Sequence, residues 1–287
     1  MLKLTSLRSS IRLSRASYIL LSGFLLTILL MAYIWWPLAE DYLAYIDWQG
    51  PWWLALDWLL IGIFLAMTLL IMIRADLRRD IKIILVGLVG GLVIESWGTQ
   101  TNLWVYYTNE RHPLWIIPAW PIASLAIDRL TRLGCHLTRQ LEVKTQPQAG
   151  IQPGANQSIQ RNYTKHIKLA YWLLFLAFYA IMLRFVAPTL DKSLTWASLI
   201  LCIFLILTPD DHRLALLTFL SGAGLGYFLE VWGTTRLCWT YYTLQTPPFF
   251  AILAHGMAAV AFGRALSLTY RLPLLSSLPR IFKQVLR

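Results

Sequence analysis

Two glutamates end long apolar runs and begin the same short motif. Glu95 follows residues 83–94, Glu230 follows residues 214–229, and each opens the pattern E-x-W-G-T-x4-W-x-Y-Y-T. An ionised carboxylate that faces lipid is costly, so we expect both side chains to face the protein interior. Burial favours the neutral acid, which can protonate an olefin, couple protons to transport or simply make a hydrogen bond.

The aromatic residues of the motif have the type expected in the wall of a binding pocket. Aromatic faces stabilise cations and pack against flat apolar ligands. Trp and Tyr also concentrate at membrane interfaces, so a purely structural role is the alternative, and Gly98 and Gly233 have the type expected of helix C-caps. The predicted substrate-binding residues are Trp97, Trp104, Tyr106, Tyr107, Trp232, Trp239, Tyr241 and Tyr242.

The two motifs belong to one internal repeat with a shift of 135 residues, the difference between positions 95 and 230. The register runs without a gap from Asp76 on Asp211 to Arg129 on Arg264. Matches fall mainly on Gly, Trp, Tyr, Glu, Arg and Pro, which shared hydrophobicity alone does not explain. The chain therefore contains a duplicated unit.

One difference between the repeats introduces a titratable group. His255 stands where the first repeat has Trp120. An imidazole can carry a proton at physiological pH, although a single buried histidine is more often a packing residue. The predicted catalytic residues are therefore Glu95, Glu230 and His255.

The composition indicates a membrane protein. Of the 287 residues, 57% are hydrophobic and 14% are charged, whereas a soluble domain has about 25% charged residues. The apolar content also excludes a disordered chain, and three cysteines without a CxxC pair do not make a disulfide framework. Stretches of about 20 apolar residues cross a bilayer as helices. Eight stretches qualify, namely Tyr18–Trp36, Trp53–Ile73, Ile81–Ser96, Pro113–Ile127, Ile167–Ala187, Ser193–Thr208, Arg213–Leu229 and Pro247–Leu266.

Basic residues fall mainly on one side of these spans. With the N-terminus inside, 21 of the 25 Lys and Arg residues lie on the inner side and four lie on the outer side. This distribution predicts a multi-pass protein of the inner cell membrane with both termini in the cytoplasm. The inner cations suit anionic lipid headgroups, so the net charge of +11 requires no nucleic-acid partner.

The predicted fold is an all-α, polytopic integral membrane protein with about eight transmembrane helices in two parallel four-helix repeats. Each repeat has an even number of spans, so both enter the membrane in the same orientation, related by an axis along the membrane normal. The first repeat covers residues 1–132 and the second covers residues 166–287. Residues 133–165 are a polar cytoplasmic linker, rich in Gln, Pro and Gly, which we expect to be flexible.

Signatures of several common activities are absent from the sequence. It has no Walker A loop, no HExxH, no GxSxG and no pair of DDxxD stretches. The histidines in the loops lack the spacing of metal ligands. We therefore predict no metal site and no cofactor.

The motif and its flanks resemble the integral-membrane carotenoid-biosynthesis family, which contains the carotenoid 1,2-hydratases and the membrane lycopene cyclases. The likeness covers Gly87–Ala126, with an echo at Gly222–Ala261. The resemblance implies an isoprenoid lipid substrate and protonation of a terminal double bond by Glu95 or Glu230. Protonation would leave a carbocation, which water or ring closure would quench. The Trp and Tyr residues would line the pocket and stabilise this cation. The chain departs from the family in its clear duplication, and it lacks a P-x-E-(E/D) string.

Two other functions remain open at the level of sequence. A proton-coupled carrier of a small or lipidic solute would place a path between two parallel halves, with the glutamates as coupling groups. A non-catalytic membrane scaffold would use the repeated motif only for packing. Repeat symmetry favours a carrier, whereas the aromatic rather than polar character of the motif disfavours it. The oligomeric state is open as well.

Overall fold

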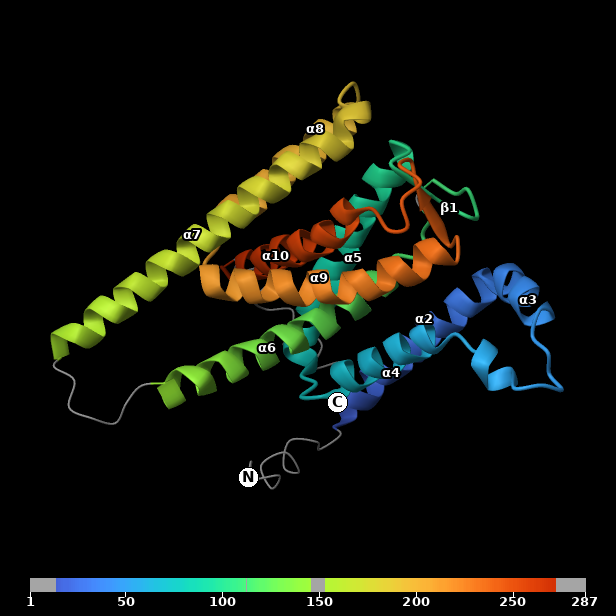
Figure 1. Ribbon diagram of the computed structural model, residues 1–287, viewed down its shortest axis with the longest axis horizontal. Helices are drawn as coiled ribbons and strands as arrows, with labels where there is room; N and C mark the ends of the chain where they lie inside the picture. Colours follow the sequence, from blue (N-terminus) through green and yellow to red (C-terminus); the bar gives the residue numbers. More distant parts are fainter. Residues whose placement is uncertain (1–13, 112, 146–152, 272–287) are drawn as a thin grey trace.

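The computed structural model describes residues 14–111, 113–145 and 153–271, and within them the chain is mostly helical, as predicted (Figure 1). Two short strands form the one sheet of this part of the chain. The elements in order are α2 (Arg15–Ile34), α3 (Trp36–Ala44), η1 (Trp52–Ala55), α4 (Trp58–Met72), α5 (Leu77–Gln100), β1 (Trp104–Tyr106), α6 (Ala119–Thr145), α7 (Pro153–Val186), η2 (Ala187–Thr189), α8 (Ser193–Leu207), α9 (His212–Thr235), β2 (Trp239–Tyr241) and α10 (Phe249–Arg271).

Five helical stretches are long and apolar enough to cross a membrane. They are α2, α5, α9, α10 and the stretch Thr164–Thr189, which covers the later part of α7 together with η2. The helices α4 and α8 are apolar but shorter. Large apolar side chains such as Leu26, Leu65 and Ile200 are exposed on the outer helices, which is typical of a surface that contacts lipid. The chain is therefore a membrane protein.

The predicted and observed boundaries differ most at the fourth span and at the linker. The sequence predicts the fourth span at Pro113–Ile127, but α6 begins at Ala119 and continues to Thr145. Proline is tolerated only in the first turn of a helix, so the segment before Pro118 forms turns and Pro121 lies in the first turn. Helix also occupies residues 133–145 and 153–165 of the expected flexible linker. In the first of these stretches, leucines at three- to four-residue spacing continue along α6. Residues 146–152 and both termini lie outside the described residues.

The two halves of the chain have matching elements. Shifting the first-half bounds by 135 residues gives the second-half bounds for α4 and α8, for α5 and α9, and for β1 and β2. The helices α5, α6, α9 and α10 form the centre (Figure 1). Around them α4 contacts α6 and also α9 of the other half, while α8 contacts α10 and also α5. The inner helices of the two halves therefore cross over in matching pairs, whereas the outer helices differ, since α2 packs on α4 and α7 packs on α9 and α10.

The strand pair is symmetric in its pairing. β1 and β2 are antiparallel, with Trp104 opposite Tyr241 and Tyr106 opposite Trp239. Trp104 and Trp239 are repeat equivalents, as are Tyr106 and Tyr241, so exchanging the halves maps the register onto itself. The pair ties together the two loops that carry the motif.

The equivalent helices also begin in the same way. Asp76 caps α5 by accepting from the backbone N–H of Arg78 at 3.0 Å, and Asp211 caps α9 by accepting from Arg213 at 2.8 Å. A carboxylate at this position satisfies backbone donors that have no partner within the helix. The repeat is therefore retained in backbone detail and not only in sequence.

Gly98 and Gly233 are not helix C-caps, so that interpretation is wrong. Both lie inside their helices, whose C-caps are Thr101 and Arg236. A Cβ atom at Gly98 or Gly233 would collide with the six-membered ring of Trp104 or Trp239, respectively. The glycines let each indole lie directly against the helix.

Gly233→Ala is expected to lower the thermal unfolding midpoint of the purified protein in detergent. The Trp239 ring must move away, and overpacking of this kind costs about 1–3 kcal/mol. Gly224→Ala in the same helix is the matched control, because a Cβ there meets nothing within 4 Å. Equal midpoints for the two variants would show that the indole does not depend on the glycine.

Candidate active site

Glu95 is held by three donors from its own half of the chain. Its side chain is buried near the end of α5. Oε2 accepts a hydrogen bond from Nε1 of Trp104 at 3.2 Å. Oε1 accepts from the Tyr106 hydroxyl and from Nε1 of Trp120, both at 3.0 Å. β1 and α6 therefore fix the carboxylate against α5.

Glu230 has an equivalent set of partners with one change. Oε2 accepts from Nε1 of Trp239 at 3.0 Å, and Oε1 accepts from the Tyr241 hydroxyl at 2.8 Å. The third partner is Nε2 of His255, 2.8 Å from Oε1. The His255 side chain is 22% exposed and that of Glu230 is 4% exposed, so the histidine is the more open member of this pair.

The third partner decides what each carboxylate can do. An indole N–H only donates, whereas an imidazole nitrogen donates or accepts and the ring can be protonated. Burial, and next the neighbouring carboxylate, raise the pKa of the hydroxyls of Tyr106 and Tyr241 well above its ordinary value, so both tyrosines remain donors. Glu95 is thus surrounded by fixed donors, while Glu230 contacts one group that can exchange a proton with it.

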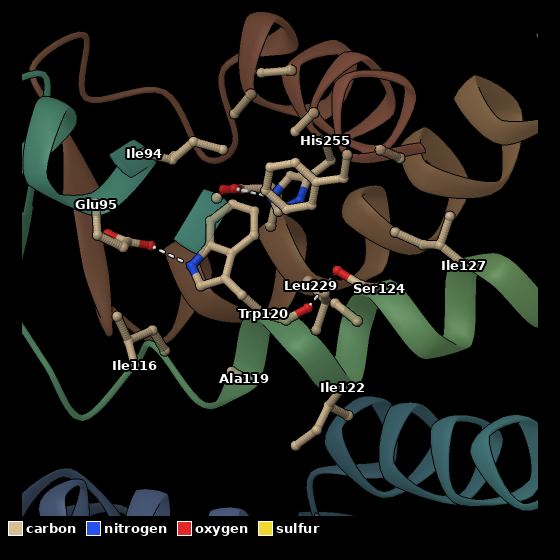
Figure 2. Close-up of a pocket in the computed structure, with 18 of the residues that line it drawn as sticks. Ile94, Glu95, Ile116, Ala119, Trp120, Ile122, Ser124, Ile127, Leu229 and His255 are labelled. Carbon is tan, nitrogen blue, oxygen red and sulfur yellow. Dashed lines mark hydrogen bonds and ion pairs between the residues drawn. The ribbon is translucent and has the colours of Figure 1, made fainter. Parts of the chain in front are cut away.

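Trp120, which donates to Glu95, and His255, which contacts Glu230, stack on each other. Their rings are stacked, with centroids 6.0 Å apart and planes at 17°. Figure 2 shows the Trp120 indole directed at Glu95 and the His255 ring lying beside it, directed at the second carboxylate. Gly91 and Gly226 leave room for these rings, since a Cβ at either would collide with its own partner ring. The stacked rings therefore connect the surroundings of Glu95 with those of Glu230.

Both glutamates lie in the wall of one cavity of about 1440 Å³. Small-molecule sites usually have volumes of about 300–1000 Å³, so the space suits a large or extended ligand. Apolar side chains from both halves make up most of the wall, among them Ile94, Ile122 and Leu229 (Figure 2). A buried acid in such surroundings can act on an apolar ligand.

Six of the eight predicted aromatic residues line this cavity. Nε1 of Trp97 is 3.4 Å from the Thr195 hydroxyl, and Nε1 of Trp232 donates to Asp57 at 2.8 Å. Each therefore bonds to an element of the opposite half. The six are Trp97, Trp104, Tyr106, Trp232, Trp239 and Tyr241.

Tyr107 and Tyr242 are placed differently. The Tyr107 hydroxyl donates to the backbone carbonyl of Ile34 in α2, and the Tyr242 hydroxyl donates to that of Phe185 in α7 at 2.7 Å. Neither residue is among those that line the cavity. These two tyrosines therefore connect the motif loops to the outer helices.

Trp120 is a residue of the site that the motif did not predict. It lies outside the shared string and 25 residues after Glu95. The signal that points to it is its place in the repeat, because it is the equivalent of His255. A difference between repeats at a position facing the shared carboxylates marks where the halves diverge.

Among the residues that the structure describes, no three His, Cys, Asp or Glu side chains are grouped so as to hold a metal ion. Comparisons with protein-family models, with curated proteins and with solved structures give no match to this chain.

Proposed function

We propose that this chain is an integral membrane enzyme that protonates a double bond of an isoprenoid or carotenoid-like lipid, as a hydratase or a cyclase. Glu230 is the acid in this proposal. The observation that supports it most is the contact between Glu230 and His255 in the wall of a large apolar cavity. The cavity suits an apolar ligand, and the contact joins a carboxyl group to an imidazole, whose ring nitrogens can both donate and accept a proton.

In the proposed reaction, the Glu230 carboxylic acid transfers its proton to one carbon of the double bond. The other carbon becomes a carbocation and Glu230 becomes a carboxylate. For hydration, water adds to the cation and releases a proton; for cyclisation, a second double bond attacks and the ring cation loses a proton. His255 accepts the released proton and returns it to Glu230, so the acid is regenerated without redox change.

The aromatic wall has a role in this reaction. A carbocation in an apolar cavity has little water to stabilise it, and the faces of Trp and Tyr rings attract positive charge. Trp104, Trp120 and Trp239 lie in the wall close to the two carboxylates. Their indole N–H groups hold the carboxylates in place at the same time.

Glu95 is a positioning group in this proposal. Its carboxylate accepts only from indole and hydroxyl donors among the described residues, so it contacts no side chain that could reprotonate it near pH 7. It fixes the Trp120 ring on which His255 stacks. The duplication thus supplies one structural site and one reactive site.

We also propose that α4, α6 and α8 cross the membrane together with the five longer apolar stretches. The chain then has eight spans in two parallel repeats, and the helix ends that carry most of the Lys and Arg residues lie on the cytoplasmic side of the inner membrane. The matching bounds of the two halves and the distribution of Lys and Arg support this arrangement.

The function is tested by expression in a bacterium that accumulates both acyclic carotenoids and isoprenoid phosphates. Wild type is expected to give a product heavier by one water or an isomer with altered retention, measured by chromatography with mass spectrometry. The double variant Glu95→Gln/Glu230→Gln, with its abundance in the membrane checked by immunoblot, is expected to give none. Products that are identical with and without the wild-type protein would contradict the enzyme proposal.

A proton-coupled carrier is the second candidate. The cavity is bounded by equivalent helices of both halves, an arrangement common in carriers with parallel repeats. Vesicles containing the purified protein discriminate the two. Solute uptake driven by a proton gradient, without chemical change of the solute, would favour the carrier.

A further inference from the structure

The cavity that holds the glutamates extends to the basic end of the helical bundle. Its wall includes Arg79 and Lys82 from the start of α5 and Arg132 from α6. Lys82 and Glu95 are 13 residues apart on the same helix, which corresponds to about 20 Å along its axis. The cavity therefore has a cationic end and, about 20 Å away, an end with the carboxylates.

Lys82 is unusual because it is buried without a carboxylate partner. Its exposed fraction is 5%, and its Nζ lies 3.9 Å from the ring centroid of Tyr270. No Asp or Glu of the described residues forms an ion pair with it. A buried ammonium group is costly unless an anion or strong acceptor approaches it.

The arginines beside Lys82 share too few acids. Asp128 lies 2.6 Å from Nη2 of Arg79, and 2.8 Å from both Nη1 of Arg129 and Nη2 of Arg132. Asp80, which is fully buried, pairs with Arg129 at 2.7 Å. Together with the lysine, four cationic side chains have two carboxylate partners, and Asp76 at the N-cap of α5 adds a third carboxylate at this end. This leaves a formal excess of one positive charge.

Several buried donors at this end have no partner among the described residues. They include Nε of Arg79, Nε of Arg132 and the hydroxyl of Thr131. Thr131 is 5% exposed and belongs to the cavity wall. Unpaired buried donors beside excess positive charge are what an anionic group with several acceptor oxygens requires.

We propose that the basic end of the cavity binds the phosphate of an isoprenoid phosphate, while its apolar chain runs along the cavity to Glu230 and His255. This inference rests on the proposed function and names its substrate class. Phosphate oxygens match guanidinium and ammonium donors, and a chain of about 20 Å would bring the distal double bond, not the one next to the phosphate, to the acid. The phosphate thereby selects which double bond is protonated.

Binding of three probes to the purified protein tests the proposal: geranylgeranyl monophosphate, geranylgeraniol and inorganic phosphate. Native mass spectrometry or a thermal shift titration gives each affinity. We expect wild type to bind the monophosphate at least about tenfold more tightly than the alcohol, because charge-assisted hydrogen bonds hold the head. Lys82→Gln and Arg132→Gln are expected to lose about tenfold in monophosphate affinity and to bind the alcohol as wild type does.

The matched controls are Arg78→Gln on α5 and Arg139→Gln on α6, two exposed arginines outside the cavity wall. Neither is expected to change the affinity for any probe. Retained binding of the alcohol shows that the test variants are folded.

Three results would overturn the proposal. They are equal affinity for the monophosphate and the alcohol, binding of inorganic phosphate as tight as that of the lipid, and equal displacement of the probe by phosphatidylglycerol. Equal affinity for the monophosphate and the alcohol would still agree with isoprenoid binding, because the apolar part of the lipid would then bind without help from the phosphate. Failure of both isoprenoids to bind would contradict the proposed function as well.

Discussion

Glu230→Gln is expected to abolish product formation, whereas Glu95→Gln retains a measurable part of it. The amide that replaces the Glu230 carboxyl group cannot supply a proton, and loss of a general acid costs about 10²–10⁴-fold in rate. At position 95 the change replaces one acceptor oxygen by an amide N–H₂ facing Nε1 of Trp104. The buried N–H of Trp104 then has no acceptor, which costs about 1–3 kcal/mol of stability.

The two variants are compared in the same host and in the same unfolding assay. The amount of product per unit of protein, measured by mass spectrometry, distinguishes Glu230, which we expect to be the acid, from Glu95, which we expect to have a structural role. The unfolding midpoint is expected to fall in both, because each carboxylate accepts three hydrogen bonds. Equal loss of product in both variants, or a greater loss for Glu95→Gln, would show that the assignment of roles is wrong.

His255→Trp is expected to fold and to lose about 10²–10⁴-fold of the activity. The change gives the second half the residue of the first, and Gly226 provides the same clearance that Gly91 provides for Trp120. The indole N–H can donate to Glu230 as Trp120 donates to Glu95, but it cannot accept or return a proton. Product yield and thermal unfolding, measured together, separate loss of proton exchange from loss of structure.

Trp120→Phe is the matched control for the histidine variant. It removes the N–H donor to Glu95 but keeps an aromatic ring in the stack with His255. We expect a lower unfolding midpoint with activity within about tenfold of wild type, because one hydrogen bond contributes about 1–3 kcal/mol when its partner is left buried. Activity of His255→Trp close to that of wild type would remove the histidine from the proposed reaction.

The repeat made part of the site predictable. Glu95, Trp104 and Tyr106 lie within 12 residues of one another, so a helix, a tight loop and a short strand are enough to bring them together. The same spacing in the second half predicts the same cluster around Glu230. Contacts between residues this close in sequence depend on local geometry, which their spacing predicts.

Contacts between the halves were not predictable in the same way. The stacking of Trp120 on His255 and the bond from Trp232 to Asp57 join residues more than 130 positions apart. They depend on how the helices cross, and no local periodicity encodes that. The same holds for the pairing of β1 with β2, since three-residue strands inside a loop give no alternating pattern long enough to recognise.

The two neighbouring tyrosines of the motif illustrate the limit. Tyr106 faces Glu95, whereas Tyr107 reaches the backbone of α2. Successive residues of an extended segment point in opposite directions, so the two cannot share one site. The motif alone does not distinguish them, because a three-residue strand leaves no pattern that marks the segment as extended. Likewise, Lys82 and Arg132 indicate only the cytoplasmic side of the membrane in the sequence. In the structure they lie in the wall of the same cavity as the carboxylates.

Solvent deuterium measures the proposed proton transfer most directly. Membranes containing the wild-type protein are incubated in D₂O with a supplied acyclic isoprenoid, and the product is analysed by mass spectrometry after back-exchange of hydroxyl positions in H₂O. In hydration the proton that His255 returns to Glu230 comes from the solvent, so the account predicts one carbon-bound deuterium in each hydrated product molecule, and no labelled product from membranes containing Glu230→Gln. A hydrated product that forms in D₂O without carbon-bound deuterium would contradict protonation of a double bond by this site.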